Sequence, residues 1–250
     1  MPERQPKSRR GEVALIQLLP NALTLGAICA GVTAIRMAAF GSFDTAVALI
    51  ILACVLDGVD GRMARALGSE SPLGAELDSL ADFVNFGVAP AMVLYFRALE
   101  SAPQIGWLAA LAYAMCCVLR LARFNVGVKS DNGGDKRFFT GVPSPAGALL
   151  ALAPIFLLRA FPSLAPLPPL AVAIWLVLVG GLMISRIPTF SLKTTIYAEY
   201  TRLVLVGITA AVAALAIYPW MTLLLFDIGY LCAILASWRA SRHPLTEAED

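Results

Sequence analysis

Charged side chains are scarce in this sequence. Only 14% of its 250 residues are Asp, Glu, Lys or Arg, while 59% are apolar and the mean hydropathy is +0.77. Soluble domains carry about 25% charged residues, so this composition excludes an ordinary soluble protein and indicates an integral membrane protein. The formal net charge is only +2, which leaves no basic surface of the kind that binds nucleic acid.

Histidine is rarer still. The single His243 lies in the C-terminal tail, so a catalytic triad that depends on histidine has no candidate here. Cysteines are present but lack metal-ligand or redox spacing, and we interpret them as small core residues. They are Cys29, Cys54, Cys116, Cys117 and Cys232. Neither an internal repeat nor a signal-peptide cleavage pattern is evident.

Hydrophobic runs of about 20 residues recur along the chain, each long enough to cross a bilayer as a helix. The predicted fold class is all-α, a polytopic membrane helix bundle of about eight transmembrane helices. The predicted spans are 20–40, 44–66, 74–97, 105–126, 143–161, 168–186, 201–218 and 219–238.

The distribution of Lys and Arg predicts how this bundle lies in the membrane. If the N-terminus is cytoplasmic, only Arg36, Arg97 and Arg159 lie outside, and the other sixteen basic residues lie inside. Such an excess on the cytoplasmic side is the usual pattern of membrane proteins. We therefore expect both termini in the cytoplasm.

One polar stretch interrupts the apolar pattern. It runs Asp57-Gly-Val-Asp60-Gly61-Arg-Met-Ala64-Arg65 and, eight residues later, Gly74-Ala-Glu-Leu-Asp78-Ser-Leu-Ala-Asp82. Helical spacing places Asp57, Gly61, Ala64 and Arg65 on one face, with Asp60 one turn from Asp57. Asp78 and Asp82 are one turn apart on a second helix. Two facing helices would bring the four carboxylates into one cavity at the cytoplasmic side.

Such a cluster needs compensating positive charge. Each ionised carboxylate in a membrane helix costs about 2.5–3.5 kcal/mol, and neighbouring like charges repel one another. Arg65 supplies one unit of charge and two divalent cations would supply four. Oxygen-only ligands suit Mg²⁺ or Mn²⁺ rather than zinc. The alternative, solvated acids at a helix end, does not explain four acids at helical spacing in a segment that penalises them.

The two stretches resemble the signature of the CDP-alcohol phosphotransferases, D-x-x-D-G-x-x-A-R-x8-G-x3-D-x3-D, and match it at every fixed position. The resemblance implies that Asp57, Asp60, Asp78 and Asp82 hold two metal ions and that Asp82 is the base. It further implies that Gly61, Ala64, Arg65 and Gly74 receive the cytidine nucleotide and its diphosphate. A bacterial-type inner (plasma) membrane location and a homodimer are also expected.

Further polar residues near the cytoplasmic surface are candidates for binding. Asn21 and Thr24, one turn apart, would either bind a ligand phosphate or cap the start of their helix. Arg120, Arg123, Asn125 and Lys136 would either bind the acceptor alcohol or, for the arginines, reach lipid headgroups. Asp227, within the last span, has no predicted role.

Three stretches favour one acceptor within the family. L-P-N-A-L-T-L at 19–25, R-L-A-R-F-N-V at 120–126 and F-F-T-G-V-P-S-P-A at 138–146 resemble the members that use serine. The expected reaction therefore transfers a phosphatidyl group from CDP-diacylglycerol to L-serine and releases CMP. An arginine would suit the serine carboxylate, whereas choline would call for an aromatic cage.

Alternatives stay open at this point. Within the family, the chain could make phosphatidylcholine or phosphatidylglycerophosphate. A cation or proton transporter would also use intramembrane acids, but its sites should lie near the midplane. The expected organisation is a basic segment with an interfacial helix (1–19), a six-helix catalytic core (20–195), two additional transmembrane helices (196–238) and a cytoplasmic tail (239–250).

Overall fold

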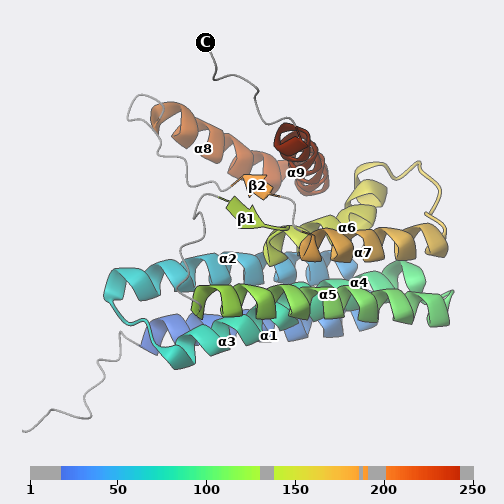
Figure 1. Cartoon of the computed structure of the whole chain (residues 1–250). Coiled ribbons are helices and arrows are strands. Elements are labelled where there is room, and N and C mark those ends of the chain that lie inside the picture. Colours follow the sequence, from blue (N-terminus) through green and yellow to red (C-terminus); the bar gives the residue numbers. More distant parts are fainter. Residues whose placement is uncertain (1–17, 130–137, 186–187, 191–200, 243–250) are drawn as a thin grey trace, which may run out of the picture.

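The computed structural model describes residues 18–129, 138–185, 188–190 and 201–242, and in this part the chain is almost entirely helical (Figure 1). The α-helices are α1 (Leu19–Ala39), α2 (Phe43–Leu67), α3 (Pro72–Asp82), α4 (Ala89–Leu94), α5 (Pro103–Lys129), α6 (Ser144–Ala160), α7 (Pro169–Ile184), α8 (Thr201–Ile217) and α9 (Pro219–Arg242). A π-helical segment, η2 (Phe83–Val88), joins α3 to α4, and a second one, η3 (Tyr95–Leu99), extends α4, so that Pro72–Leu99 form one continuous helix.

The all-α expectation is confirmed apart from one small feature. Strands β1 (Phe138–Thr140) and β2 (Pro188–Phe190) pair antiparallel, with Phe139 opposite Thr189. This ribbon ties the segment before α6 to the segment after α7. Figure 1 shows it between α6 and α7 on one side and α8 and α9 on the other.

Among the residues that the structure describes, four helices are long and apolar enough to cross a membrane. They are Leu19–Ala39, Pro72–Leu99, Pro103–Val126 and Pro219–Arg239. Three more apolar helices are shorter, at Ser144–Ala160, Pro169–Ile184 and Leu205–Ile217. Helix α2 has 25 residues, but its C-terminal part carries the polar motif. The structure therefore agrees with a membrane protein, and the count of eight spans stays a prediction.

Small residues let α1 and α2 lie close together. Ala27, Ala30 and Ala34 of α1 and Ala46 and Ala53 of α2 are all at most 7% exposed. Side chains of this size allow the backbones of membrane helices to approach closely. The start of α1 consequently lies against the end of α2, where the motif aspartates are.

A glycine ends α2 and a serine caps the start of α3. Gly68 has φ +58°, so it ends α2 in the left-handed conformation that glycine adopts without strain. The hydroxyl of Ser71 accepts a hydrogen bond from the Gly74 backbone N–H at 3.0 Å and caps α3, with Pro72 at its first turn. The chain thus reverses within four residues, which returns α3 alongside the bundle.

Proline disturbs two of the core helices, and each disturbance is compensated by an aromatic side chain. Pro90 has no N–H for the carbonyl of Phe86, four residues earlier; the buried Tyr113 hydroxyl donates to that carbonyl at 2.8 Å. Pro154 likewise leaves the carbonyl of Leu150 without its helical partner, and the indole N–H of Trp175 donates to it at 2.8 Å.

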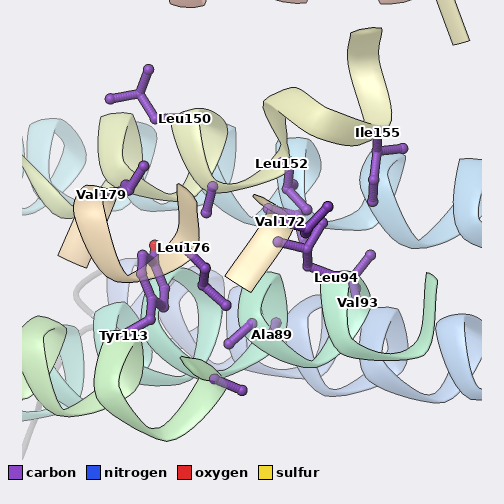
Figure 2. Close-up of a cluster of buried hydrophobic side chains, with 14 of the residues drawn as sticks. Ala89, Val93, Leu94, Tyr113, Leu150, Leu152, Ile155, Val172, Leu176 and Val179 are labelled. Atoms are coloured by element: carbon purple, nitrogen blue, oxygen red, sulfur yellow. The ribbon is translucent and has the colours of Figure 1, made fainter. Parts of the chain in front are cut away.

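The main core fills the space between α4, α5, α6 and α7. Figure 2 shows Tyr113 of α5 beside Leu176 of α7, with Val93 and Leu94 of α4 facing Ile155 of α6. These side chains are at most 2% exposed. This packing holds α4 against α5, α6 and α7. Because α3 and α4 belong to one continuous helix, it also holds Asp78 and Asp82 at a fixed position.

The three arginines predicted to lie outside do gather at the end of the bundle away from the aspartates. Arg159 forms an ion pair with Asp44 near the start of α2 and lies 5.8 Å from the Trp220 ring. Arg36 and Arg97 lie over the rings of Phe40 and Phe43 at 5.4 and 5.5 Å. Asp57 is thirteen residues beyond Asp44 on the same helix, a rise of about 20 Å.

Candidate metal and nucleotide site

The predicted cluster of aspartates forms where α2 and α3 meet. Carboxylate oxygens of Asp57, Asp60 and Asp78 lie within 4.8 Å of one another. Asp82 does not belong to this group of three, but its side chain is within hydrogen-bonding reach of Asp57 and close to Asp78. The helical spacing therefore predicted which acids share a face of each helix. In the structure the two faces meet, with three of the acids in one group and Asp82 beside it.

Asp60 is the most buried of the four, at 3% exposed. The hydroxyl of Thr24, on α1, donates to Asp60 Oδ2 at 2.6 Å, and no described residue donates a hydrogen bond to Asp60 Oδ1. Thr24 is thus neither a free ligand group nor only a helix cap, because it orients a carboxylate of the cluster. Sequence reasoning had left its role open.

The donor set fits a divalent cation that prefers oxygen. All four side chains are carboxylates, and each of Asp60 and Asp82 has a buried oxygen without a partner in the part of the chain that the structure describes. Buried carboxylate oxygens without donors are costly. A Mg²⁺ or Mn²⁺ ion is the kind of ligand that such a set binds.

A cavity of about 490 Å³ opens directly beside the cluster, between α1, the end of α2 and the start of α3. All six residues predicted to bind nucleotide or phosphate line it: Asn21, Thr24, Gly61, Ala64, Arg65 and Gly74. Asp60 and Asp78 form part of the same wall. The cavity therefore joins the acid cluster to a recess with small side chains on the α2 face.

Gly74 and Arg65 shape two parts of the cavity wall. A Cβ on Gly74 would come within 3.1 Å of Asn21 Oδ1 and 3.2 Å of Ser71 Oγ, so a larger residue would crowd both. The Arg65 guanidinium extends back along α2 to within 3.8 Å of where a Cβ on Gly61 would lie. It is also close enough to Asp78 to interact with it electrostatically. Arg65 thus faces the cavity as its only lining cation among the described residues.

The predicted acceptor residues have different surroundings. Arg120 is half-buried, donates to the buried Ser144 hydroxyl and interacts electrostatically with Asp82. Asn125 donates to Ser79 Oγ at 3.0 Å, next to Asp78 in sequence. Arg123 is exposed and donates to the Ile184 carbonyl at 2.7 Å, at the end of α7. Lys136 lies outside the described residues.

A model of the CDP-alcohol phosphatidyltransferase family matches residues 17–220. The chain belongs to this family. Among curated relatives, a CDP-diacylglycerol–serine O-phosphatidyltransferase from Mycobacterium leprae is 42% identical over 235 residues, 92% of this chain and 77% of that protein. Proteins with the same name from Mycobacterium tuberculosis and Helicobacter pylori are 38% identical over 243 residues (95% and 83%) and 36% identical over 172 residues (69% and 71%).

The sequence reasoning missed one part of this phosphatidyltransferase site. The cavity is also lined by Ser69, Glu70 and Ser71, from the eight-residue spacer of the motif. Ser69 has a buried hydroxyl without a partner in the described chain. A signal existed, because two serines within a four-residue turn between the two acidic helices offer hydroxyls at the cavity. The motif specifies only the length of this spacer, not its residues.

Proposed function

We propose that this chain transfers the phosphatidyl group of CDP-diacylglycerol to the hydroxyl of L-serine, giving phosphatidylserine and CMP. The observation that carries this proposal is the convergence of Asp57, Asp60 and Asp78 beside a cavity. All fixed residues of the motif except Asp57 and Asp82 line that cavity. The family supports the reaction type. The names of relatives that are 36–42% identical support serine as the acceptor.

The nucleotide end of the substrate would occupy the 490 Å³ cavity. Gly61 and Ala64 leave room for the cytidine against the α2 face, and Gly74 lets the diphosphate approach the start of α3. Arg65 would donate to a diphosphate oxygen, since a guanidinium forms strong charge-assisted hydrogen bonds with phosphate. Asn21 and the backbone of the first turn of α3 would complete the donors.

Asp57, Asp60, Asp78 and Asp82 would hold two ions, Mg²⁺ or Mn²⁺. When bound, these ions supply positive charge that offsets the charge developing on the diphosphate. Asp60 has a fixed orientation for this role because Thr24 holds one of its oxygens. Asp57 is shared, since it is close to both Asp60 and Asp82.

Asp82 is the proposed general base. It lies on the inner side of the cluster, and Arg120 is the nearby cation that would attract the serine carboxylate. In the proposed step the serine hydroxyl loses its proton to Asp82, its oxygen bonds to the lipid-side phosphorus, and the bond to the CMP oxygen breaks. Ser144, which accepts from Arg120, would keep the guanidinium aimed at this position.

We further propose eight spans with both termini and the aspartates on the cytoplasmic side of a bacterial inner membrane. The grouping of Arg36, Arg97 and Arg159 at one end of the bundle supports this orientation. The organisation remains a six-helix core (20–195) with two additional helices (196–238), flanked by segments 1–19 and 239–250. A homodimer is the proposed assembly, on the family resemblance alone.

The test compares acceptors with purified protein and labelled CDP-diacylglycerol. Serine should support release of CMP and formation of phosphatidylserine, in the presence of Mg²⁺ or Mn²⁺, while choline and glycerol phosphate should not. Faster transfer to glycerol phosphate or choline would reassign the acceptor. No CMP release with any acceptor would remove the transferase and leave a transporter to be tested.

A further inference from the structure

A second cavity, of about 300 Å³, lies between α6, α7 and α9 and shares no lining residue with the aspartate-lined cavity. Its wall is almost entirely apolar and includes Leu157, Trp175, Leu224 and Leu231. Among the described residues that line it, Asp227 is the only one with an ionisable side chain. The family-model match ends at residue 220, so Asp227 lies beyond the matched region.

Asp227 has no compensation in the part of the chain that the structure describes. The residue is 2% exposed, and neither carboxylate oxygen has a hydrogen-bond partner. Arg159, on the same helix as Leu157, is already paired with Asp44. A buried, unpaired carboxylate in a membrane helix costs several kcal/mol on most scales, and acids in such positions usually face a partner or a ligand.

We propose that this cavity binds an amphiphile that carries a protonated amine on an alkyl tail. The tail would lie against the leucines and Trp175, and the ammonium group would donate to both oxygens of Asp227. A small-molecule site commonly has this form, an apolar recess with a few polar groups that fix orientation.

Charge and coordination chemistry favour an amine over other ligands. An anion would be repelled by Asp227. A divalent cation takes six or more oxygen ligands, and this wall offers one carboxylate among hydrocarbon side chains. A neutral alcohol would fill the recess but satisfy only one oxygen, without the added strength of a charge-assisted hydrogen bond.

The experiment uses fluorescence of the full chain in phosphatidylcholine nanodiscs. A medium-length primary alkylamine with bromine atoms in its tail is the probe, because bromine quenches a tryptophan that it contacts and Trp175 lines the cavity. The corresponding brominated alcohol and carboxylate are run in parallel. Variants are Asp227→Asn, which keeps the shape and removes the charge, and Trp175→Phe, which removes the reporter. Glu100→Gln is the matched control, an acid-to-amide change at an exposed position that does not line this cavity.

The amine should quench in a saturable way and be displaced by its unbrominated form. Asp227→Asn should weaken its affinity at least about tenfold, as removal of one partner of a buried charge pair does, while Glu100→Gln should not. Trp175→Phe should lose the saturable component. Equal quenching by amine, alcohol and carboxylate, or by wild type and Asp227→Asn, would mean ordinary partitioning into lipid and would overturn the proposal. Binding is the readout, so the outcome is separate from that of the transferase assay.

Discussion

The four motif aspartates and Asp227 are all acids of a membrane bundle, but their surroundings differ. The motif acids lie next to one another, with Thr24, Arg65 and Arg120 close by. Asp227 lines a cavity whose other described lining residues are all apolar, and neither of its oxygens has a hydrogen-bond partner in the described chain. The first arrangement concentrates negative charge of the kind that polyvalent cations neutralise. The second offers a single carboxylate, which one cationic hydrogen-bond donor would neutralise. On these grounds we propose a metal site for the first arrangement and a site for a single cationic group for the second.

Loss of a shared metal ligand should have the largest effect. We expect Asp57→Asn to reduce turnover below detection, because Asp57 is close to both Asp60 and Asp82 and both proposed ions would lose a carboxylate. Chelation should do the same to wild type, with recovery on adding Mg²⁺ or Mn²⁺. The measurement is release of labelled CMP. Glu100→Gln, an acid at the other end of the bundle, is the control and should keep its activity.

Asp82→Asn should lower turnover by about 10²–10⁴-fold, the usual contribution of a general base. Nucleotide binding should survive, because Asp82 does not line the 490 Å³ cavity. Single-turnover kinetics with equilibrium binding of CDP-diacylglycerol would separate the two quantities. Near-normal turnover in this variant would remove Asp82 as the base, and an equal loss of nucleotide affinity would make it mainly a metal ligand.

Arg120 and Arg123 form a matched pair on one helix. Arg120→Ala should raise the serine KM about 10- to 100-fold, as loss of a hydrogen bond to a charged group does, and should change the lipid KM much less. Arg123→Ala should have a smaller effect, equal for both substrates, since its guanidinium is bound to the end of α7. Equal effects of the two variants on serine would refute the distinction between them.

Helical spacing predicted the acid cluster because periodicity within a helix decides which residues share a face. It could not say which other helix faces them. Thr24 and Asp60 are 36 residues apart, and Arg123 and the Ile184 carbonyl are 61 apart, so those pairs depend on how α1, α5 and α7 pack. Likewise, the predicted span 74–97 lies within one continuous helix, but hydrophobic periodicity does not predict the two π-helical segments in it.

Thr24→Val should weaken metal binding without destroying the site. Removal of a group that orients a metal ligand typically lowers metal affinity about 10- to 100-fold. We expect a correspondingly higher Mn²⁺ concentration for half-maximal activity, with nearly full turnover at saturating Mn²⁺. Thr33→Val is a suitable control, because its hydroxyl only donates to the Cys29 carbonyl within α1. An unchanged Mn²⁺ requirement in Thr24→Val would mean that Asp60 needs no support from α1.

The smallest expected effects concern the two proline-disturbed helices, one near each group of acids. Tyr113→Phe leaves the Phe86 carbonyl unpaired just beyond Asp82, and Trp175→Phe leaves the Leu150 carbonyl unpaired beside the Asp227 cavity. Each should lower the free energy of unfolding by about 1–3 kcal/mol, the cost of an unsatisfied buried polar group. Unfolding in mixed detergent measures this, with Tyr218→Phe and Trp107→Phe, at exposed positions, as controls. Only Tyr113→Phe should also reduce CMP release per folded molecule, because the Phe86 carbonyl lies on the continuous helix that carries the proposed base. If both variants reduced it equally, the two regions would be coupled more tightly than their separate cavities imply.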